Sequence, residues 1–230
     1  MQYRAYLFDV QGTLLDFYTP VRAAVAHHLR SIGRDPAAAD DLTRAWRTDY
    51  FQRVSRLTQS VEQWSKVQDE YVAGLRDVFA ANDIEVPPDD DVRRIAASWT
   101  QLVPWPDTAA GLARIRSDAV IGCLSNTDMR TMIRLFKRLG IDWDVVLTAE
   151  VFGAFKPDAR VYGRAVRYLG FAPSDVAMVA SHPYDLHAAA AVGLGTVFLH
   201  RPDEYGDPGL AHMADEGEFG QHVESVSDIR

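Results

Sequence analysis

The sequence contains one cysteine, three lysines and no apolar run long enough to cross a membrane. Cys123, as the single cysteine, cannot form an intramolecular disulfide, so we expect the protein to reside in a reducing compartment. A bilayer span needs roughly 20 apolar residues, and the first residues show no signal-peptide pattern. We therefore expect a cytoplasmic protein with no membrane partner.

The chain is also short of basic charge. Acidic residues outnumber basic residues 32 to 24, which gives a formal net charge of −8 over 230 residues. This balance provides no general basic surface, so it argues against nucleic acid as a partner. Apolar residues make up 47% of the chain, which is typical of a globular protein with one large domain or a core and a smaller domain.

Short apolar segments alternate with helical segments at the start of the chain and again after residue 101. We expect strands at residues 5–8, 119–124, 145–149, 176–180 and 196–199. Helices are expected at residues 109–116, 129–139, 159–169 and 186–192. The alternation predicts an α/β fold, a doubly wound parallel sheet with a Rossmann-like core and a site at the carboxyl ends of its strands.

Between residues 20 and 100 the pattern changes to helical periodicity. One helix face is marked by Leu42, Trp46, Tyr50, Val54 and Leu57. A second is marked by Trp64, Tyr71, Leu75 and Phe79, and residues 92–99 suggest a third helix. We see no convincing strand here, so residues 17–100 are predicted to form an all-helical cap domain inserted after the first strand. Residues 1–16 and 101–230 would form the catalytic core, with the cap excluding water from a cleft.

Asp9 stands where the first expected strand ends. A carboxylate there faces the crevice, and the backbone N–H groups of Val10 and Gln11 can be presented to an anion. Gly12 allows the turn, and the hydroxyl of Thr13 can aim one carboxylate oxygen of Asp9. The alternative is an ordinary aspartate that begins a turn.

Ser125 and Asn126 come at the end of the second expected strand of the core. Their side chains could bind a substrate carboxylate. They could equally cap the helix that follows.

Lys156 precedes a proline, so its backbone is held extended and its side chain can reach inward. A cation near Asp9 would keep that carboxylate ionised. Tyr162 follows on the next helix. The alternative is a surface lysine before a helix.

A fourth loop runs through Ser181, His182 and Asp185, again after an apolar strand. Asp185 could orient a water molecule or pair with Lys156. His182 could act as a donor or as a base near neutral pH. A helix-capping aspartate is the alternative for Asp185.

The four loops follow four strands in the order Asp, Ser, Lys, Asp, and this order resembles the haloacid dehalogenase superfamily over almost the whole chain. The similarity is closest to the type II 2-haloacid dehalogenases. Its markers are DxxGT at residues 9–13, GTLLD at 12–16, SN at 125–126, KPDARVY at 156–162, the acidic loop at 180–185 and RPDEYG at 201–206.

The resemblance implies a catalytic role for four residues. Asp9 would attack the carbon that bears the halogen and form an ester, with Thr13 aiming its carboxylate. Water, assisted by Lys156 and Asp185, would then hydrolyse the ester.

The resemblance also implies the substrate contacts. The cap arginine of the family, which follows a tryptophan, matches Arg47 after Trp46; the alternative is a solvated helix residue. The other expected substrate contacts are Val10 and Gln11, through their N–H groups, and Ser125, Asn126, Tyr162 and His182.

Phosphatases of the superfamily differ at two places. They carry a second aspartate where this chain has Gln11, and paired acids where it has only Asp185 beside Ala180, Ser181 and His182. Mg²⁺ prefers oxygen ligands, and this set is poor in charge. A departing halide needs neither a proton nor a metal, so we expect no metal and no cofactor.

The sequence thus predicts a metal-independent hydrolase that releases halide from short 2-haloalkanoic acids. Gln11 and His182 depart from the family pattern, which leaves open the same ester chemistry on a non-halogenated carboxylate, such as ring opening of a strained cyclic imino acid. A phosphatase or a non-catalytic binding protein has less support. The expected partner is a small 2-halocarboxylate, and a homodimer stays open.

Overall fold

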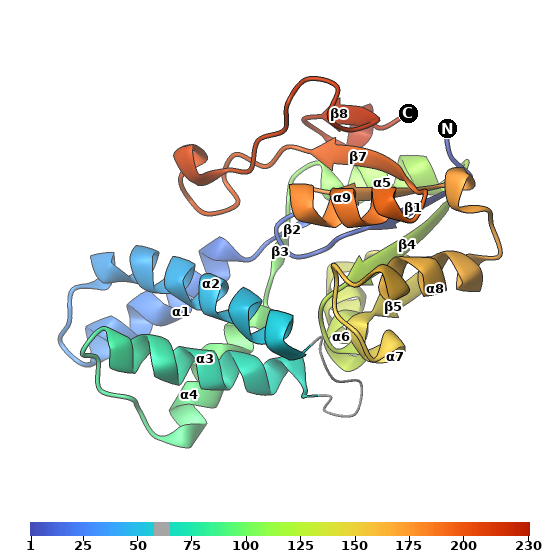
Figure 1. The fold of residues 1–230 in the computed structure, drawn as a ribbon. Helices are drawn as coiled ribbons and strands as arrows, with labels where there is room; N and C mark the ends of the chain where they lie inside the picture. Colours follow the sequence, from blue (N-terminus) through green and yellow to red (C-terminus); the bar gives the residue numbers. More distant parts are fainter. Residues whose placement is uncertain (58–64) are drawn as a thin grey trace.

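The computed structural model describes residues 1–57 and 65–230. Its main sheet has six parallel strands in the order β5-β4-β1-β6-β7-β8 (Figure 1). The strands are β1 (Ala5–Phe8), β4 (Val120–Ser125), β5 (Val145–Thr148), β6 (Val176–Ala180), β7 (Gly195–Leu199) and β8 (Gln221–Val223). The predicted α/β fold with a doubly wound parallel sheet is confirmed.

Strand β1 shows why the core strands form. All four of its side chains are fully buried, as expected for a central strand of a parallel sheet covered on both faces. Tyr6 and Phe8 belong to the hydrophobic cluster that includes helices α5 (Thr108–Arg116) and α6 (Met129–Leu139). Ala5 and Leu7 belong to the cluster of α8 (Ala159–Leu169) and α9 (Pro183–Ala191). Successive side chains of β1 thus point to opposite faces of the sheet and belong to two different hydrophobic clusters.

Several details of the fold differ from the prediction. The apolar run after residue 145 ends as a strand at Thr148, because Ala149–Phe152 turns into the short helix α7. Helix α9 begins at Pro183, earlier than expected. Strand β8 was missed, since it is three residues long and contains polar Gln221 and His222.

The described part of residues 17–100 is helical, and these helices lie to one side of the sheet (Figure 1). The long helices are α1 (Tyr18–Ser31), α2 (Ala39–Leu57), α3 (Val67–Ala81) and α4 (Asp89–Ala96), with short 3₁₀ turns at Pro36–Ala38 and Ala97–Thr100. Trp64, expected on the second helix, lies outside the described residues. We keep residues 17–100 as the proposed cap and the rest as the proposed core.

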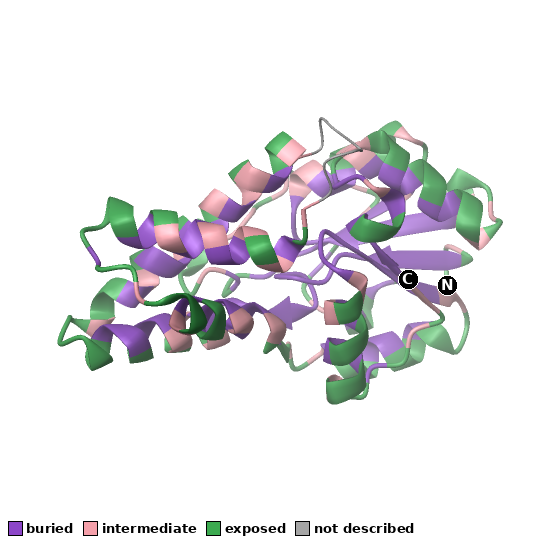
Figure 2. Ribbon diagram, turned by 90° about the horizontal axis from the view of Figure 1, so that it is seen from below, coloured by how far each residue is buried: buried purple, intermediate pink, exposed green. Residues whose placement is uncertain are grey.

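The chain leaves the core and returns to it at one place. The two short strands β2 (Leu15–Asp16) and β3 (Val103–Pro104) pair antiparallel at this junction. Aromatic side chains fill the interior of the helical part beside it: the rings of Tyr71 and Trp99 stack with centroids 4.4 Å apart, and Tyr50 stacks on Tyr71 at 4.6 Å. Figure 2 shows this buried interior continuing from the helices into the sheet.

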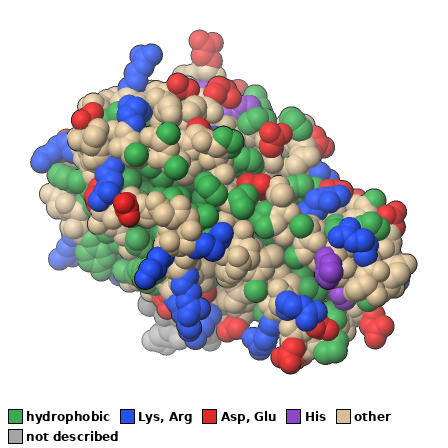
Figure 3. Space-filling model, turned by 180° about the vertical axis from the view of Figure 1, so that it is seen from behind, with side chains coloured by type: hydrophobic (Ala, Val, Ile, Leu, Met, Phe, Trp, Pro, Cys, Tyr) green, Lys and Arg blue, Asp and Glu red, His purple; other side chains and the backbone are tan. Residues whose placement is uncertain are grey.

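None of the described helices is long and apolar enough to cross a membrane. On the face shown in Figure 3, acidic and basic side chains are intermingled, so that face carries no continuous basic surface. The expected absence of a nucleic-acid partner, the cytoplasmic location and the oligomeric state stay predictions.

Candidate active site

The predicted site residues meet at the carboxyl edge of the sheet. Asp9 follows β1, Ser125 ends β4, and Asp185 lies in the first turn of α9, which follows β6. Lys156 comes from the loop before α8, and Arg47 comes from α2 in the helical part. All five side chains are buried, as expected where parallel strands end in one crevice.

Asp9 is held by donors on both oxygens. Its Oδ1 accepts a hydrogen bond from Nζ of Lys156 at 2.9 Å, and its Oδ2 accepts one from Oγ1 of Thr13 at 2.8 Å. Burial alone would raise the pKa of Asp9, but Lys156 and His182 outweigh it and hold this pKa below the usual value. Asp9 is therefore a carboxylate at neutral pH, and the hydroxyl of Thr13 donates to it.

The turn after Asp9 depends on Gly12. Gly12 has a φ of +90°, and a Cβ there would lie 2.2 Å from Oε1 of Glu204. A side chain is thus excluded by both the backbone and the neighbouring acid. Among the described residues, the N–H groups of Val10 and Gln11 donate to no protein atom, so they remain available to an anion.

Lys156 links two carboxylates. Its Nζ donates to Asp9 and to Oδ2 of Asp185. Its backbone is fixed by Asn126: the Lys156 N–H donates to Oδ1 of Asn126 at 2.7 Å, and Nδ2 of Asn126 donates to the Lys156 carbonyl at 2.9 Å. The surface-lysine alternative is therefore wrong.

Two expected substrate contacts have other partners. The side-chain amide of Asn126 is occupied at both ends by Lys156, so Asn126 positions the lysine. Tyr162 does not line the cavity at Asp9; its hydroxyl donates to Oδ1 of Asp185 from behind. Helix capping does not explain Ser125 or Asn126 either, because α6 begins after Asp128.

Arg47 is buried without a carboxylate partner among the described residues. Its Nη1 donates to Oε1 of Gln11 at 3.2 Å, while its Nε has no hydrogen-bond partner. The guanidinium carbon lies 4.3 Å from the ring centroid of Phe51 and 4.6 Å from that of Phe17. These rings offset part of the cost of burial. The solvated-residue alternative for Arg47 is wrong.

Gln11 is also only partly satisfied. Its Oε1 accepts from Arg47 and from the hydroxyl of Tyr71 at 3.0 Å, but its buried Nε2 has no partner. A buried donor without a partner costs free energy, about 1–3 kcal/mol. Both Gln11 and Arg47 therefore leave an N–H group unpaired beside Asp9.

His182 joins Asp9 to an acid that the sequence interpretation did not assign. Its Nδ1 lies 3.2 Å from Oδ2 of Asp9, and its Nε2 lies 2.8 Å from Oε1 of Glu204. Glu204 also accepts from Oγ of Ser181 at 3.2 Å. Glu204 belongs to the RPDEYG motif, which is the sequence feature that could have marked it as a site residue. In a tail rich in Gly, Asp and Glu, a buried acid looks like its exposed neighbours.

The cavity at this site is small. Its volume is about 10 Å³, enough for about one water molecule. It is lined by Asp9, Gln11, Arg47, Tyr50, Phe51, Ser125, Asn126, Lys156, His182 and Tyr184. Core and helical segments both contribute walls.

A magnesium ion does not fit this arrangement. The ammonium of Lys156 already occupies the position between Asp9 and Asp185, and the Gln11 oxygen faces Arg47 and Tyr71. Mg²⁺ needs several oxygen ligands turned toward one point. Elsewhere in the described residues, His182, Glu204 and His212 bring potential metal-ligand atoms within 4.8 Å of one another.

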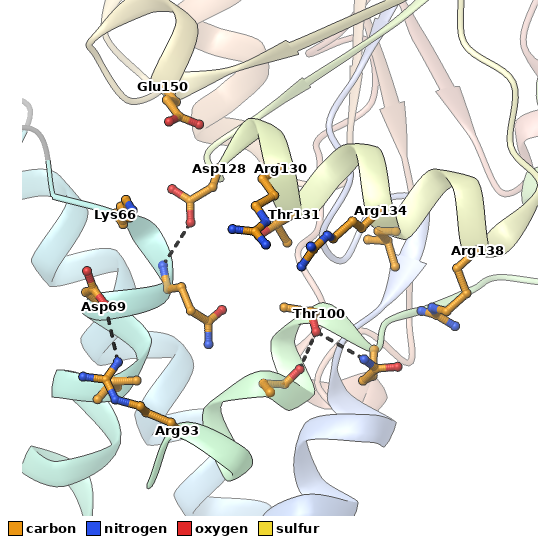
Figure 4. A pocket seen from close by; sticks show the side chains of 15 residues that line it. Lys66, Asp69, Arg93, Thr100, Asp128, Arg130, Thr131, Arg134, Arg138 and Glu150 are labelled. Carbon is orange, nitrogen blue, oxygen red and sulfur yellow. Dashed lines mark hydrogen bonds and ion pairs between the residues drawn. The ribbon is translucent and has the colours of Figure 1, made fainter. Parts of the chain in front are cut away.

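A large cavity lies away from Asp9, between α3, α4 and α6, and has a volume of about 710 Å³. Figure 4 shows Arg130 and Arg134 projecting into it from α6. At its edge the carboxylate of Asp128 accepts from the N–H groups of Val67 and Gln68. This contact ties α3 to the loop that carries Ser125.

Three comparisons bear on these observations. A family model described as haloacid dehalogenase-like hydrolase matches residues 3–193. The (S)-2-haloacid dehalogenase 4A of Burkholderia cepacia is 29% identical over 216 residues, which cover 91% of this chain and 90% of that protein. The crystal structure of the L-2-haloacid dehalogenase PA0810 has a TM-score of 0.87 at 32% identity and covers 98% of this chain and 96% of that one. The defluorinating L-2-haloacid dehalogenase Rha0230 has a TM-score of 0.87 at 29% identity, covering 98% and 93%.

Proposed function

On the premise that the chain belongs to the haloacid dehalogenase-like hydrolases, we propose that it releases halide from short 2-haloalkanoic acids. The reaction proceeds through an ester on Asp9 and uses no metal. The names of the relatives specify the (S) or L configuration, and we propose the same handedness for the substrate of this enzyme.

The observation that carries the proposal is the unpaired Arg47. Arg47 makes no salt bridge among the described residues, and the nearby acid that acts on it, Glu204, is already paired with His182. A buried charge is costly unless it is paired, and this one lines the cavity that also holds Asp9. An anionic substrate offsets that charge while its carbon faces the Asp9 carboxylate. The free N–H groups of Val10 and Gln11 and the hydroxyl of Ser125 can take up the substrate carboxylate.

In the first step, an Asp9 oxygen forms a bond to the carbon that bears the halogen. The carbon–halogen bond breaks, and its electron pair leaves with the halide. Lys156 and Thr13 orient the attacking carboxylate through their hydrogen bonds. Arg47, an obligate cation, attracts the departing halide.

In the second step, water attacks the Asp9 carboxyl carbon. Asp185 accepts a hydrogen bond from the same Lys156 ammonium that contacts Asp9. Burial raises the pKa of Asp185, although the positive charge of Lys156 acts to lower it. A carboxylate of raised pKa is a better base, so Asp185 takes the proton from water. The bond from carbon to the substrate oxygen breaks, which frees the hydroxy acid and restores Asp9.

The small cavity favours small substrates. Its volume of about 10 Å³ holds about one water molecule, so even a haloacid of two or three carbons needs the walls to move apart, and a larger substrate would need more movement. The basic side chains of the large cavity, Arg130 and Arg134 among them, create a local positive potential that attracts anions to the seam between the helical part and the sheet.

The alternative of ring opening also has support in the structure. A departing amine gains from donors, and Gln11 and His182 both present N–H groups to the cavity. Dehalogenation and ring opening can be distinguished by their products, because only dehalogenation releases halide. The test is halide release from (S)- and (R)-2-chloropropionate, chloroacetate and fluoroacetate, beside a cyclic imino acid and an aryl phosphate. Release of halide from none of the haloacids would contradict the proposal.

A further inference from the structure

The ring of His182 lies between two carboxylates. Its Nε2 is 2.8 Å from Glu204 and its Nδ1 is 3.2 Å from Asp9. A neutral imidazole has a hydrogen on one nitrogen only, so its other nitrogen would turn a lone pair toward a carboxylate. The proximity of a carboxylate to each nitrogen therefore favours a ring with hydrogens on both nitrogens.

Glu204 is fixed behind this ring. One of its oxygens faces His182 and the other accepts from Ser181, and its side chain is 1% exposed. The bare backbone of Gly12 leaves the space that the Glu204 carboxylate fills. Fixed in this way, Glu204 cannot turn away from the ring.

The two carboxylates that face His182, Glu204 and Asp9, support its charge. Two other rings also face it: His212, with ring centroids 5.3 Å apart, and Tyr184, at 5.6 Å. Burial lowers the pKa of His182, but Glu204 and Asp9 outweigh it and raise this pKa to about 9. Burial and His182 lower the pKa of His212, which therefore stays neutral.

The Nδ1–H group of His182 is not satisfied in the resting site. It lies 3.2 Å from Oδ2 of Asp9 but makes no hydrogen bond with acceptable geometry. When water attacks the ester, the carboxyl carbon becomes tetrahedral and its oxygen leaves the original plane. Donors placed for that position, and not for the resting carboxylate, stabilise the intermediate.

Building on the proposed function, we propose that His182 is a catalytic residue of ester hydrolysis and that Glu204 is the positioning residue that keeps its ring charged. As water adds to the Asp9 carboxyl carbon, the negative charge on its oxygen is met by the Nδ1–H group and by Thr13. The proton of water goes to Asp185. When the ester bond breaks, its electron pair goes to the product oxygen, which takes the proton from Asp185, and His182 keeps both of its own.

This role makes a specific prediction for Glu204→Gln, tested by rapid-quench measurement of halide from chloroacetate and bromoacetate. Loss of the counter-charge weakens the oxyanion site but leaves Asp9 free to attack. The value of kcat should fall by about 10-fold or more, after a burst of about one halide per active site. Because both substrates form the same ester, their kcat values should become equal. A variant with no burst and with kcat still dependent on the halogen would overturn the proposal.

Glu218→Gln is the matched control. Glu218 pairs with His187 at 2.9 Å on the exposed side of α9, so this change also removes an acid from a histidine. It should leave the burst and kcat of the wild type unchanged. An equal effect in both variants would mean that the loss of an acid in general, and not the position of Glu204, alters the rate.

The state of the ring can be measured without turnover. In ¹⁵N NMR near neutral pH, the resting wild type should show His182 protonated on both nitrogens, and Glu204→Gln should show one proton. A singly protonated His182 in the wild type would overturn the inference, as would an equivalent of zinc bound by His182, Glu204 and His212, because a metal needs the Nε2 lone pair. A doubly protonated ring in an enzyme that releases no halide would instead contradict only the proposed function.

Discussion

Nζ of Lys156 lies 2.9 Å from Oδ1 of Asp9, although 147 residues separate them in the sequence. The same ammonium donates to Asp185, so one buried cation joins the two carboxylates of the site. In this position a fixed side chain supplies the positive charge that a bound divalent ion could otherwise provide. Together with His182, the lysine holds the pKa of Asp9 below its usual value.

The first prediction follows from that position. Halide release should survive exhaustive chelation with EDTA and should not increase on addition of Mg²⁺, because the oxygens of Asp9 and Asp185 are already turned toward Lys156. The measurement is initial rate before and after chelation, with a magnesium-dependent phosphatase treated in parallel. Activity that disappears with EDTA and returns with Mg²⁺ would contradict the proposed mechanism.

Much of the site could be predicted because it depends on the ends of strands. Asp9, Ser125 and Asp185 each follow an apolar segment, and the carboxyl ends of parallel strands meet at one edge. Sequence thus gives the neighbourhood of a side chain. It does not give its hydrogen-bond partners, so the bonds of Asn126 to Lys156 and of Tyr162 to Asp185 were not foreseen.

Other features depend on packing between distant segments. The burial of Glu204 follows from the empty space at Gly12 and from the ring of His182, neither of which is near it in sequence. Strand β8 forms because β7 offers a free edge, and not because residues 221–223 are strongly apolar. Such features follow from tertiary structure, so local patterns do not reveal them.

A second prediction concerns Arg47→Lys. Lysine keeps the charge but loses the planar fork of donors that serves both Gln11 and the cavity. The value of kcat/KM for chloroacetate should fall roughly 10-fold to 100-fold, since a hydrogen bond to a charged group is worth about 1.5–3 kcal/mol. Arg56→Lys, at an exposed position on the same helix, is the control and should match the wild type. Equal kinetics for Arg47→Lys and the wild type would remove Arg47 from the site.

A third prediction tests whether Tyr162 supports Asp185 or lines the substrate pocket. Its hydroxyl donates to Asp185 and does not face the cavity, so Tyr162→Phe should slow ester hydrolysis and should not raise KM. The protein should also lose about 1–3 kcal/mol of stability, because a buried carboxylate loses a donor. Tyr168→Phe, 61% exposed on the same helix, should change neither quantity. A several-fold rise in KM would return Tyr162 to the wall of the substrate pocket.

A fourth prediction concerns the pH dependence of stability. The pKa of His182 is raised from 6.5 to about 9 in the folded protein, so the charged ring favours folding. Its stabilisation is complete below the unfolded value and is lost as pH rises through the folded value. The loss is on the order of 3 kcal/mol. The free energy of unfolding in urea, measured for the wild type below and above this pH range, should show the loss. The His182→Asn variant should lack this pH-dependent part of the stability. The same pH dependence in both proteins would contradict the prediction.

The last prediction tests whether Asp9 is a nucleophile or a base. A base would activate water to attack the substrate directly, and the oxygen of water would enter the product at once. A nucleophile gives its own oxygen to the product, and water repairs the carboxylate afterwards.

In a single turnover with enzyme in excess and ¹⁸O-labelled water, the label should therefore appear on the peptide that contains Asp9, while the product stays largely unlabelled. Asp9→Asn should lose nearly all activity, because a neutral amide is a far weaker nucleophile and no longer pairs with Lys156. Attack from behind the leaving group should also invert the configuration at the reacting carbon, which chiral chromatography of lactate from (S)-2-chloropropionate would show. Label found directly in the product, with none on the Asp9 peptide, would exclude the ester even if halide were released.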